Sequence, residues 1–224
     1  MNYYLIQRII AKDWYFQRNA IFAFLFAAAI CLSLIAVATE FSFAVGSILL
    51  IALIITLGAL LVSNTIVAEK TNQTLPFLIS LPISVQDYTT AKVVGNLTIF
   101  LVPWLTLMLA ASAVIYGNSS LPDGLISYGL LILTALFANY CLLLCLAITT
   151  ESQTWVVVGI FIGNMAFQGF LYYMSQLPAI TLVIRQTNTA WNSTYTTVFL
   201  LELMVAFAFI GITFFVQSRK TNFL

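Results

Sequence analysis

The residue types that perform most enzyme chemistry are scarce in this chain. It has no histidine in 224 residues, which removes the commonest general base and the commonest metal ligand. The three cysteines, Cys31, Cys141 and Cys145, all lie in apolar stretches, where we interpret them as small packing residues with no disulfide. The sequence contains neither a G-x-x-x-x-G-K-[ST] phosphate loop nor a G-x-S-x-G nucleophile turn. We therefore predict no catalytic residue and no metal site.

Glu202 is the candidate for an ionisable side chain inside an apolar stretch. Such residues are costly within a membrane and usually have a function. Glu202 lies fifteen residues before Gln217, which is about 22 Å along a helix and places it near the outer boundary of a span. Three interpretations stay open: a proton relay, a partner for Arg185, or exposure at the interface.

The amino-acid composition is typical of a membrane protein. Hydrophobic residues make up 62% of the chain and charged residues 7%, whereas soluble proteins carry roughly 25% charged residues. A lipid solvent accepts an apolar outer surface. The net charge of +1 and the absence of long basic runs give no indication of nucleic-acid binding. We predict an all-α membrane protein whose solvent is the lipid bilayer.

Six stretches are long enough to cross a bilayer, for which about 20 mostly apolar residues suffice. They predict a single transmembrane domain over residues 1–224 with six transmembrane helices. The spans are predicted at residues 20–38, 43–67, 93–116, 125–148, 155–174 and 195–216. Within the fifth span, Gly159 and Gly163 form a G-x-x-x-G pair, which permits close helix packing and, less directly, a subunit contact.

The basic residues of the connecting segments are distributed unevenly between the two sides. The positive-inside rule places the side with more Lys and Arg in the cytoplasm, so both termini are predicted to be cytoplasmic, in a multi-pass protein of the cytoplasmic (inner) membrane. One side would carry Arg185, and the other would carry Arg8, Lys12, Arg18, Lys70, Lys92, Arg219 and Lys220.

Residues 1–19 are predicted to contain an N-terminal interfacial (elbow) helix that leads into the first span. At 3.6 residues per turn its basic residues Arg8, Lys12 and Arg18 fall on one side. Asp13 and Gln17 interrupt the apolar side. The alternative is an ordinary basic flank that sets the topology. The apolar side comprises Leu5, Ile6, Ile9, Ile10 and Phe16.

Two connections are too long or too apolar for simple turns. Residues 68–92, on the predicted cytoplasmic side, contain an apolar run with two prolines, in which Thr74 could cap a short helix, Pro76 fit its first turn and Pro82 end it. Residues 175–192, on the other side, contain a shorter apolar run that suits a re-entrant or interfacial hairpin at the outer face.

The first of these connections carries a recognisable motif. The pattern E-K-x-x-x-T-L-x-F-L-I-S-L-P-I-S…Y…K over residues 69–92 resembles the membrane subunits of ABC-2 type exporters. Gln73 and Pro76 depart from the residues usual in that family. The matching residues are Glu69, Thr74, Leu75, Leu78, Leu81, Pro82, Ile83, Ser84, Tyr88 and Lys92.

This resemblance implies a permease that forms a translocation pathway and takes its energy from a separate ABC ATP-binding subunit. The chain itself would bind no cofactor, since ATP and Mg²⁺ would be held by that subunit, and a second permease copy or a related chain would complete the pathway. A coupling helix between spans two and three would dock on the ATPase, with Glu151 as a second contact. The coupling residues implied are Glu69, Lys70, Thr71, Thr74, Leu75, Phe77, Leu78 and Pro82.

Three other functions fit the sequence less well than the exporter permease. A haem-exporter-like membrane subunit has a similar topology, but no histidine is present to bind haem. A non-transporting membrane scaffold would need no apolar cytoplasmic helix. A membrane-embedded enzyme lacks a catalytic constellation. The apolar spans favour an amphipathic, lipid-like or peptide substrate.

Overall fold

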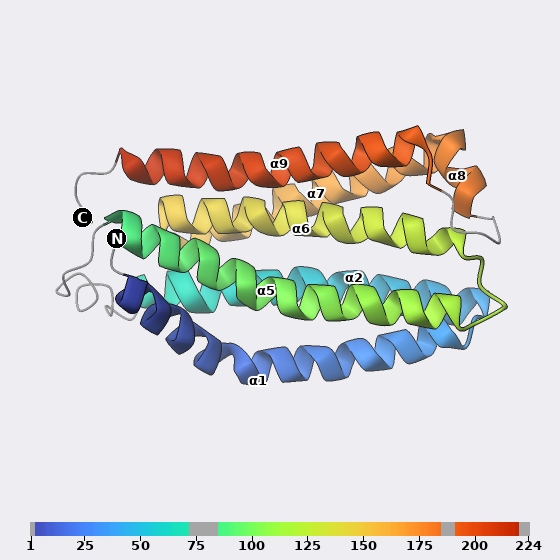
Figure 1. Cartoon of the computed structure of the whole chain (residues 1–224), viewed down its shortest axis with the longest axis horizontal. Coiled ribbons are helices and arrows are strands. Elements are labelled where there is room, and N and C mark those ends of the chain that lie inside the picture. Colours follow the sequence, from blue (N-terminus) through green and yellow to red (C-terminus); the bar gives the residue numbers. More distant parts are fainter. Residues whose placement is uncertain (1–2, 72–84, 185–190, 220–224) are drawn as a thin grey trace.

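The computed structural model describes residues 3–71, 85–184 and 191–219, and within these ranges the chain is helical and contains no strand (Figure 1). Six of the helical segments are long and apolar enough to cross a membrane, as expected of a multi-pass membrane protein. The elements are α1 Tyr3–Ala36, α2 Glu40–Val62, the π-helix η1 Ser63–Val67, α3 Ala68–Thr71, α5 Val85–Tyr116, α6 Gly124–Thr150, α7 Gln153–Gln176, α8 Pro178–Ile184 and α9 Ser193–Ser218.

Helices α2 and α9 begin where a polar side chain accepts a hydrogen bond from one of the first backbone N–H groups. The Thr39 side chain accepts a hydrogen bond from the Ser42 backbone, and the Ser42 side chain accepts one from the Thr39 backbone, which starts α2 with a capping box. Asn192 caps α9 by accepting a hydrogen bond from Tyr195 N at 2.9 Å. Short polar connections therefore separate long apolar helices.

Helix α1 is continuous, so a separate interfacial helix over residues 1–19 is not confirmed. Its N-terminal part is inclined to the rest, but both belong to one helix of 34 residues (Figure 1). The buried face also differs from the prediction, because Phe16 is 70% exposed whereas Asp13 and Gln17 are buried. Asp13 and Gln17 therefore continue the buried stripe of Ile6 and Ile9 and do not interrupt it.

Helix α6 is the centre of the bundle. Of its most apolar stretch 67% is buried, compared with 22% for α7 and 17% for α9. It contacts α2, α5, α7, α8 and α9, and the rings of Phe100 on α5 and Tyr140 on α6 stack with centroids 3.9 Å apart. Helices α7 and α9 thus lie at the periphery, each supported mainly by α6.

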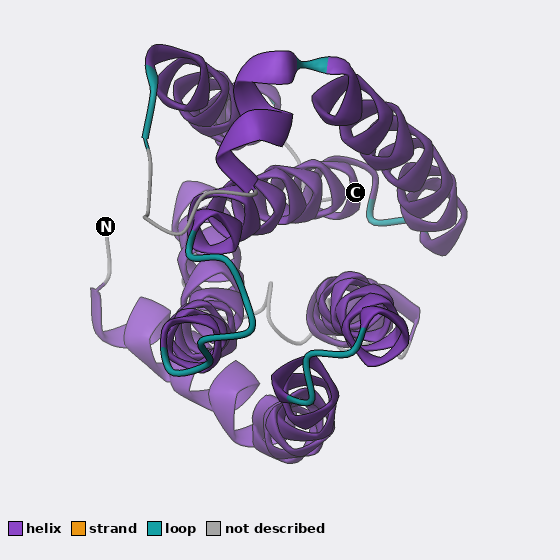
Figure 2. Cartoon of the chain, turned by 90° about the vertical axis from the view of Figure 1, so that its right-hand side faces the viewer, coloured by secondary structure: helices purple, strands orange, loops and turns teal. Residues whose placement is uncertain are grey.

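The two ends of the bundle differ. The described parts of α1 and α9 nearest the termini lie at one end, and α8 lies at the other (Figure 1). Seen end-on, α8 lies over the side of the bundle formed by α6, α7 and α9 (Figure 2), where its Val183 carbonyl leaves no room for a Cβ on Gly124. The predicted hairpin over residues 175–192 thus contains a short packed helix. Its re-entrant path is not confirmed, and residues 185–190 lie outside the described part of the chain.

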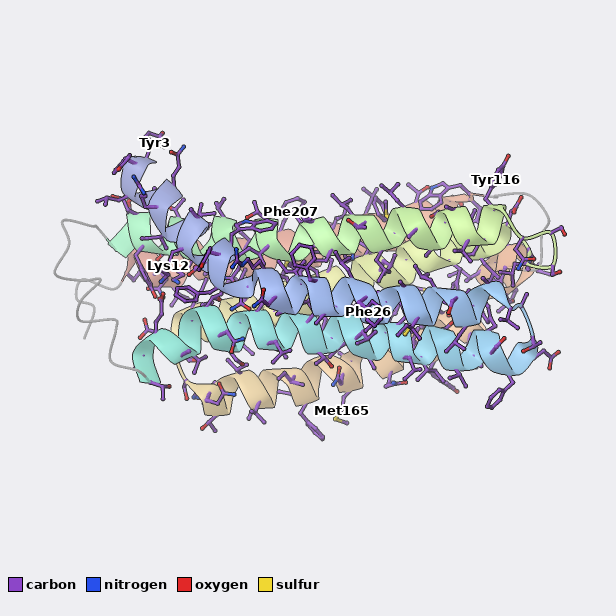
Figure 3. All side chains as sticks on the ribbon, turned by 90° about the horizontal axis from the view of Figure 1, so that it is seen from below. Tyr3, Lys12, Phe26, Tyr116, Met165 and Phe207 are labelled. Carbon is purple, nitrogen blue, oxygen red and sulfur yellow. The ribbon has the colours of Figure 1, made fainter. Side chains whose placement is uncertain are left out.

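Large apolar side chains cover the outside of the bundle (Figure 3). Phe26, Met165 and Phe207 are 72%, 62% and 66% exposed. Water would penalise such a surface, whereas hydrocarbon accepts it. The outer surface therefore agrees with the membrane assignment made from composition.

Candidate functional site

A buried lysine on α5 is bonded to three other helical elements, near the end of the bundle where the described chain begins. Lys92 on α5 is fully buried, and its Nζ donates to Asp13 Oδ2 on α1 at 2.9 Å, to Glu69 Oε1 on α3 at 2.8 Å and to the Thr65 carbonyl of η1 at 2.8 Å. An ammonium group has three N–H donors. All three are therefore used within the protein.

The two carboxylates that bind Lys92 are shared with a second lysine. Lys12 donates to Glu69 Oε1, and its Nζ lies 3.4 Å from Asp13 Oδ1. The other oxygen of Glu69 accepts from the Tyr88 hydroxyl at 3.1 Å. We call Lys12, Asp13, Glu69 and Lys92 the ion cluster. Its two positive and two negative charges balance.

The π-helix η1 helps to place the ion cluster. A π-turn is rare and often occurs at functional sites, because the wider turn disturbs the regular backbone hydrogen bonds. Here the Thr65 carbonyl accepts from Lys92, while the Thr65 hydroxyl donates to Asn96 Oδ1 at 2.8 Å. The Asn96 side-chain amide in turn donates to the Lys92 backbone carbonyl, and the Asn96 backbone carbonyl accepts from the Tyr140 hydroxyl. This hydrogen-bond series extends from the ion cluster to the central helix α6.

A second ion pair joins the end of α3 to the turn between α6 and α7. Lys70 Nζ lies 3.4 Å from Glu151 Oε2. Glu151 ends α6 in the left-handed conformation, with φ 49°, and its backbone N–H bonds to Ala147 O. The structure thus brings together Lys70 and Glu151, which were predicted as separate contacts for an ATPase.

The other predicted basic residues of α1 lie on its surface. Arg8 donates to the Tyr4 hydroxyl at 2.7 Å, and the Arg18 guanidinium lies over the Tyr15 ring, 4.3 Å from its centroid. Lys12, which was predicted to share their polar face, instead turns toward Glu69 because the carboxylate offers a buried partner. Only two of the three predicted interfacial residues therefore face outward.

Most of the predicted coupling helix lies outside the described residues. Of the residues assigned to it, the structure describes Glu69, Lys70 and Thr71, and the Thr71 hydroxyl donates to Val67 O at 3.1 Å. Thr74, Leu75, Phe77, Leu78 and Pro82 fall within residues 72–84, which are not described.

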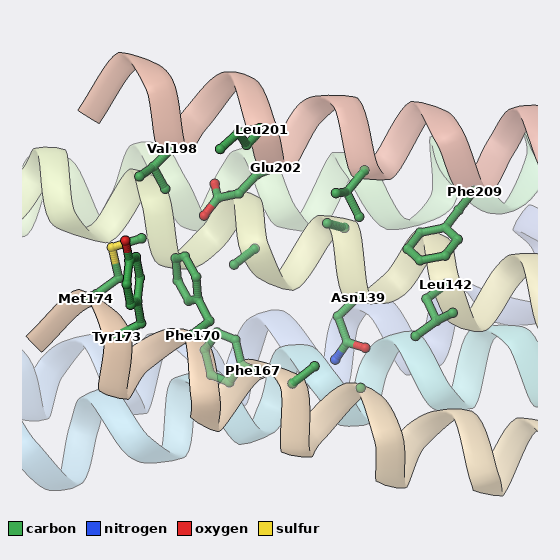
Figure 4. A pocket seen from close by; sticks show the side chains of 15 residues that line it. Asn139, Leu142, Phe167, Phe170, Tyr173, Met174, Val198, Leu201, Glu202 and Phe209 are labelled. Atoms are coloured by element: carbon green, nitrogen blue, oxygen red, sulfur yellow. The ribbon is translucent and has the colours of Figure 1, made fainter. Parts of the chain in front are cut away.

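A pocket of about 390 Å³ lies between α6, α7 and α9 (Figure 4). Glu202 of α9 and Asn139 of α6 line it, together with aromatic residues of α7 that include Phe167, Phe170 and Tyr173. Glu202 is 8% exposed, so the interpretation that it is exposed at an interface is wrong. Within the described residues neither of its carboxylate oxygens has a hydrogen-bond partner, nor does Asn139 Oδ1.

Reasoning from the sequence missed Asp13, Thr65 and Asn139. The signal for Asp13 was present, because Asp13 and Gln17 follow Ile6 and Ile9 at helical spacing and therefore share their buried face. A charged residue on such a face requires a partner. Asn139 lies in the middle of the fourth predicted span, where an amide side chain also requires one.

The chain was compared with family models, with curated proteins and with solved structures, and none of the three comparisons found a match. The arrangement of the described residues and the motif at residues 69–92 therefore carry the functional argument.

Proposed function

We propose that this chain is the membrane-spanning permease subunit of an ATP-driven ABC-2 type exporter, with a pathway for an amphipathic, lipid-like or peptide substrate. The observation that carries the proposal is that the first and last residues of the motif at residues 69–92 both belong to the ion cluster. Glu69 precedes residues 72–84, and Lys92 follows them. The two residues that bracket the motif's apolar core are bonded to each other and to α1.

This arrangement supports a mechanical role for residues 72–84. A partner that moved them would apply force at α3 and at the start of α5. The buried ion cluster joins both to α1, and the pair between Lys70 and Glu151 joins α3 to the turn before α7. Tightly packed elements move as rigid bodies, so such a displacement would reach several spans together.

Other protein chains would supply ATP hydrolysis and complete the pathway. A cytoplasmic ABC subunit binds ATP and Mg²⁺, and a second permease copy or a related chain completes the pathway. Both termini and residues 68–92 then lie on the cytoplasmic side of the inner membrane. Lys and Arg residues are more numerous at the end of the helix bundle that contains the ion cluster than at the other end, and this difference supports the orientation.

Co-purification with the ATP-binding subunit tests the proposal. The tagged chain is extracted in mild detergent, and retained proteins that carry a nucleotide-binding loop are quantified by mass spectrometry. Leu78→Asp is expected to abolish their retention, because a desolvated carboxylate in an apolar docking face costs several kcal/mol.

Val37→Asp is the matched control. Val37 is 62% exposed in the connection between α1 and α2, so the same charge is added away from the proposed docking segment, and retention should equal that of the native chain. Equal retention by Leu78→Asp and native chains of equal monodispersity would contradict the assignment and favour a non-transporting scaffold.

A further inference from the structure

The carboxylate of Glu202 is an exception among the acidic residues in the described interior. The carboxylates of Asp13 and Glu69 accept hydrogen bonds from lysines, whereas neither oxygen of Glu202 has a partner among the described residues. Burying an unpaired carboxylate costs several kcal/mol. An ionisable side chain buried within a membrane span is therefore a candidate functional group.

The pocket next to Glu202 has room for a small molecule. Its volume of about 390 Å³ lies in the range of small-molecule sites. Figure 4 shows Glu202 extending from α9 toward the aromatic rings of α7, with Asn139 further along the pocket on α6. The carboxylate of Glu202 and the amide oxygen of Asn139, which accept no hydrogen bond from the described residues, thus line the same cavity.

The other residues that line the pocket are suited to an apolar ligand with one positive charge. Apart from Glu202, Asn139 and Tyr173, the lining residues are apolar. The faces of Phe167, Phe170 and Tyr173 attract cations through their ring quadrupoles and also bury alkyl chains. A single negative charge among aromatic and aliphatic walls is complementary to one positive charge on an apolar body.

The pocket has access from the side of the bundle. Helices α7 and α9 each pack on α6, and the rim residues Tyr173, Leu201 and Val205 are 60%, 51% and 46% exposed on the outer surface. The outer surface of the bundle is the one that exposes large apolar side chains and would face lipid. A ligand dissolved in the bilayer would therefore reach the pocket without crossing the polar ends.

We propose that the pocket between α6, α7 and α9 binds a monocationic amphiphile, whose positive group pairs with Glu202 and whose apolar chain lies against the aromatic residues of α7. Binding of the amphiphile to this pocket does not require an ATP-binding subunit. The identification of the pocket as the cargo site of an exporter does rest on the function proposed above.

Binding to the purified chain alone tests the site. Radiolabelled dodecylamine is bound to the tagged chain in an uncharged detergent, and bound label is counted by scintillation proximity. We expect saturable binding that dodecyltrimethylammonium displaces and that dodecanol, of equal chain length but without charge, displaces far less. Glu202→Gln should weaken binding by at least about tenfold, as for loss of one partner of a buried charge pair.

Two controls keep the test decisive. Glu40→Gln removes an exposed carboxylate at the start of α2 and should bind as the native chain does. Thermal unfolding without ligand should show Glu202→Gln to be at least as stable as the native chain, because the variant no longer buries an unpaired charge. A folded Glu202→Gln chain that lost binding would therefore have lost a contact, not its fold.

Equal binding by native and Glu202→Gln chains, or displacement by dodecanol as effective as by the cation, would overturn the proposal and leave Glu202 as a protonation site. Arg185→Gln should leave binding unchanged. Tighter binding by Arg185→Gln would instead mean that Arg185 supplies the cation for Glu202, which would also overturn it. Failure of this test would not affect the exporter proposal, whose own test depends on Leu78.

Discussion

Lys92 and Glu202 illustrate two ways in which a membrane protein holds a charge. Lys92 is fully buried with all three N–H donors engaged, so its desolvation is offset by two carboxylates and a carbonyl. Glu202 is nearly as buried but has no hydrogen-bond partner among the described residues. The first arrangement serves structure, and the second is the more suitable for binding.

Removing Lys92 should be among the most destabilising single changes in this chain. Lys92→Met keeps an unbranched side chain but leaves the carboxylates of Asp13 and Glu69 without their central cation. Loss of one partner of a buried ion pair costs about 3–5 kcal/mol. Unfolding of the purified chain in detergent, followed by tryptophan fluorescence, measures the loss.

Lys70→Met is the matched control for that prediction. Lys70 is 53% exposed and pairs with Glu151 at 3.4 Å, and exposed pairs contribute roughly 0–1 kcal/mol. Adding Glu69→Gln to Lys92→Met should recover part of the stability, because one of the stranded charges is then removed. Equal effects of the two lysine substitutions would contradict a structural role for the ion cluster.

The sequence identified several members of the ion cluster without their pairing. Glu69 and Lys92 were marked by the family resemblance and Lys12 by its place on a polar face. Their bonds join residues far apart along the chain, up to 79 positions between Lys92 and Asp13, and periodicity carries no information about such distances. The burial of Asp13 was predictable from its face of α1, but its partner was not.

At the scale of elements, the G-x-x-x-G pair predicted close helix packing, and in the structure this pair on α7 faces α6. A Cβ on Gly159 would meet the Leu146 side chain, and one on Gly163 would overlap the amide of Asn139. The G-x-x-x-G pair therefore packs within the chain, as its first interpretation held. It also sets the spacing of α6 and α7 beside the Glu202 pocket.

Gly163→Ala should separate these helices and lower stability. The new methyl group must displace Asn139, and overpacking of this kind costs about 1–3 kcal/mol. Gly169→Ala on the same helix is the control, since no atom lies within 4 Å of its added Cβ and alanine favours helix over glycine by about 1 kcal/mol. Unfolding midpoints that fall with Gly169→Ala and not with Gly163→Ala would contradict this packing.

Hydropathy predicted the six long helices because each span must be continuously apolar. It could not predict that the helix expected within residues 1–19 and the first span form one continuous helix, α1, which begins near residue 3. Nor could it predict the π-helix η1, in which Thr65 is hydrogen-bonded to Lys92 and Asn96 of another helix. Tertiary contacts therefore decide the details that local sequence leaves open.

At the scale of the whole molecule, orientation in the membrane follows from charge and can be measured directly. In a chain freed of Cys31, Cys141 and Cys145, Ser120→Cys lies in the connection between α5 and α6, and Ser218→Cys lies at the end of α9. An impermeant maleimide added to intact cells should label the first and not the second, because both termini are predicted to be cytoplasmic.

Permeabilised cells provide the control for this labelling, since both positions are exposed and both should then react. Labelling of Ser218→Cys in intact cells would reverse the orientation. It would also place residues 68–92 on the side without ATP, and an ATP-driven partner would then be excluded.

The most direct test of an ATP-driven permease is photo-cross-linking from residue 78 in native membranes. A benzophenone maleimide is attached to Leu78→Cys in the cysteine-free chain, with Ser120→Cys as the control, and adducts are identified by mass spectrometry. We predict an adduct with an ABC ATP-binding subunit from position 78 and none from position 120. Adducts from position 78 that contain no nucleotide-binding subunit, formed with the same efficiency of probe attachment, would contradict the proposed function.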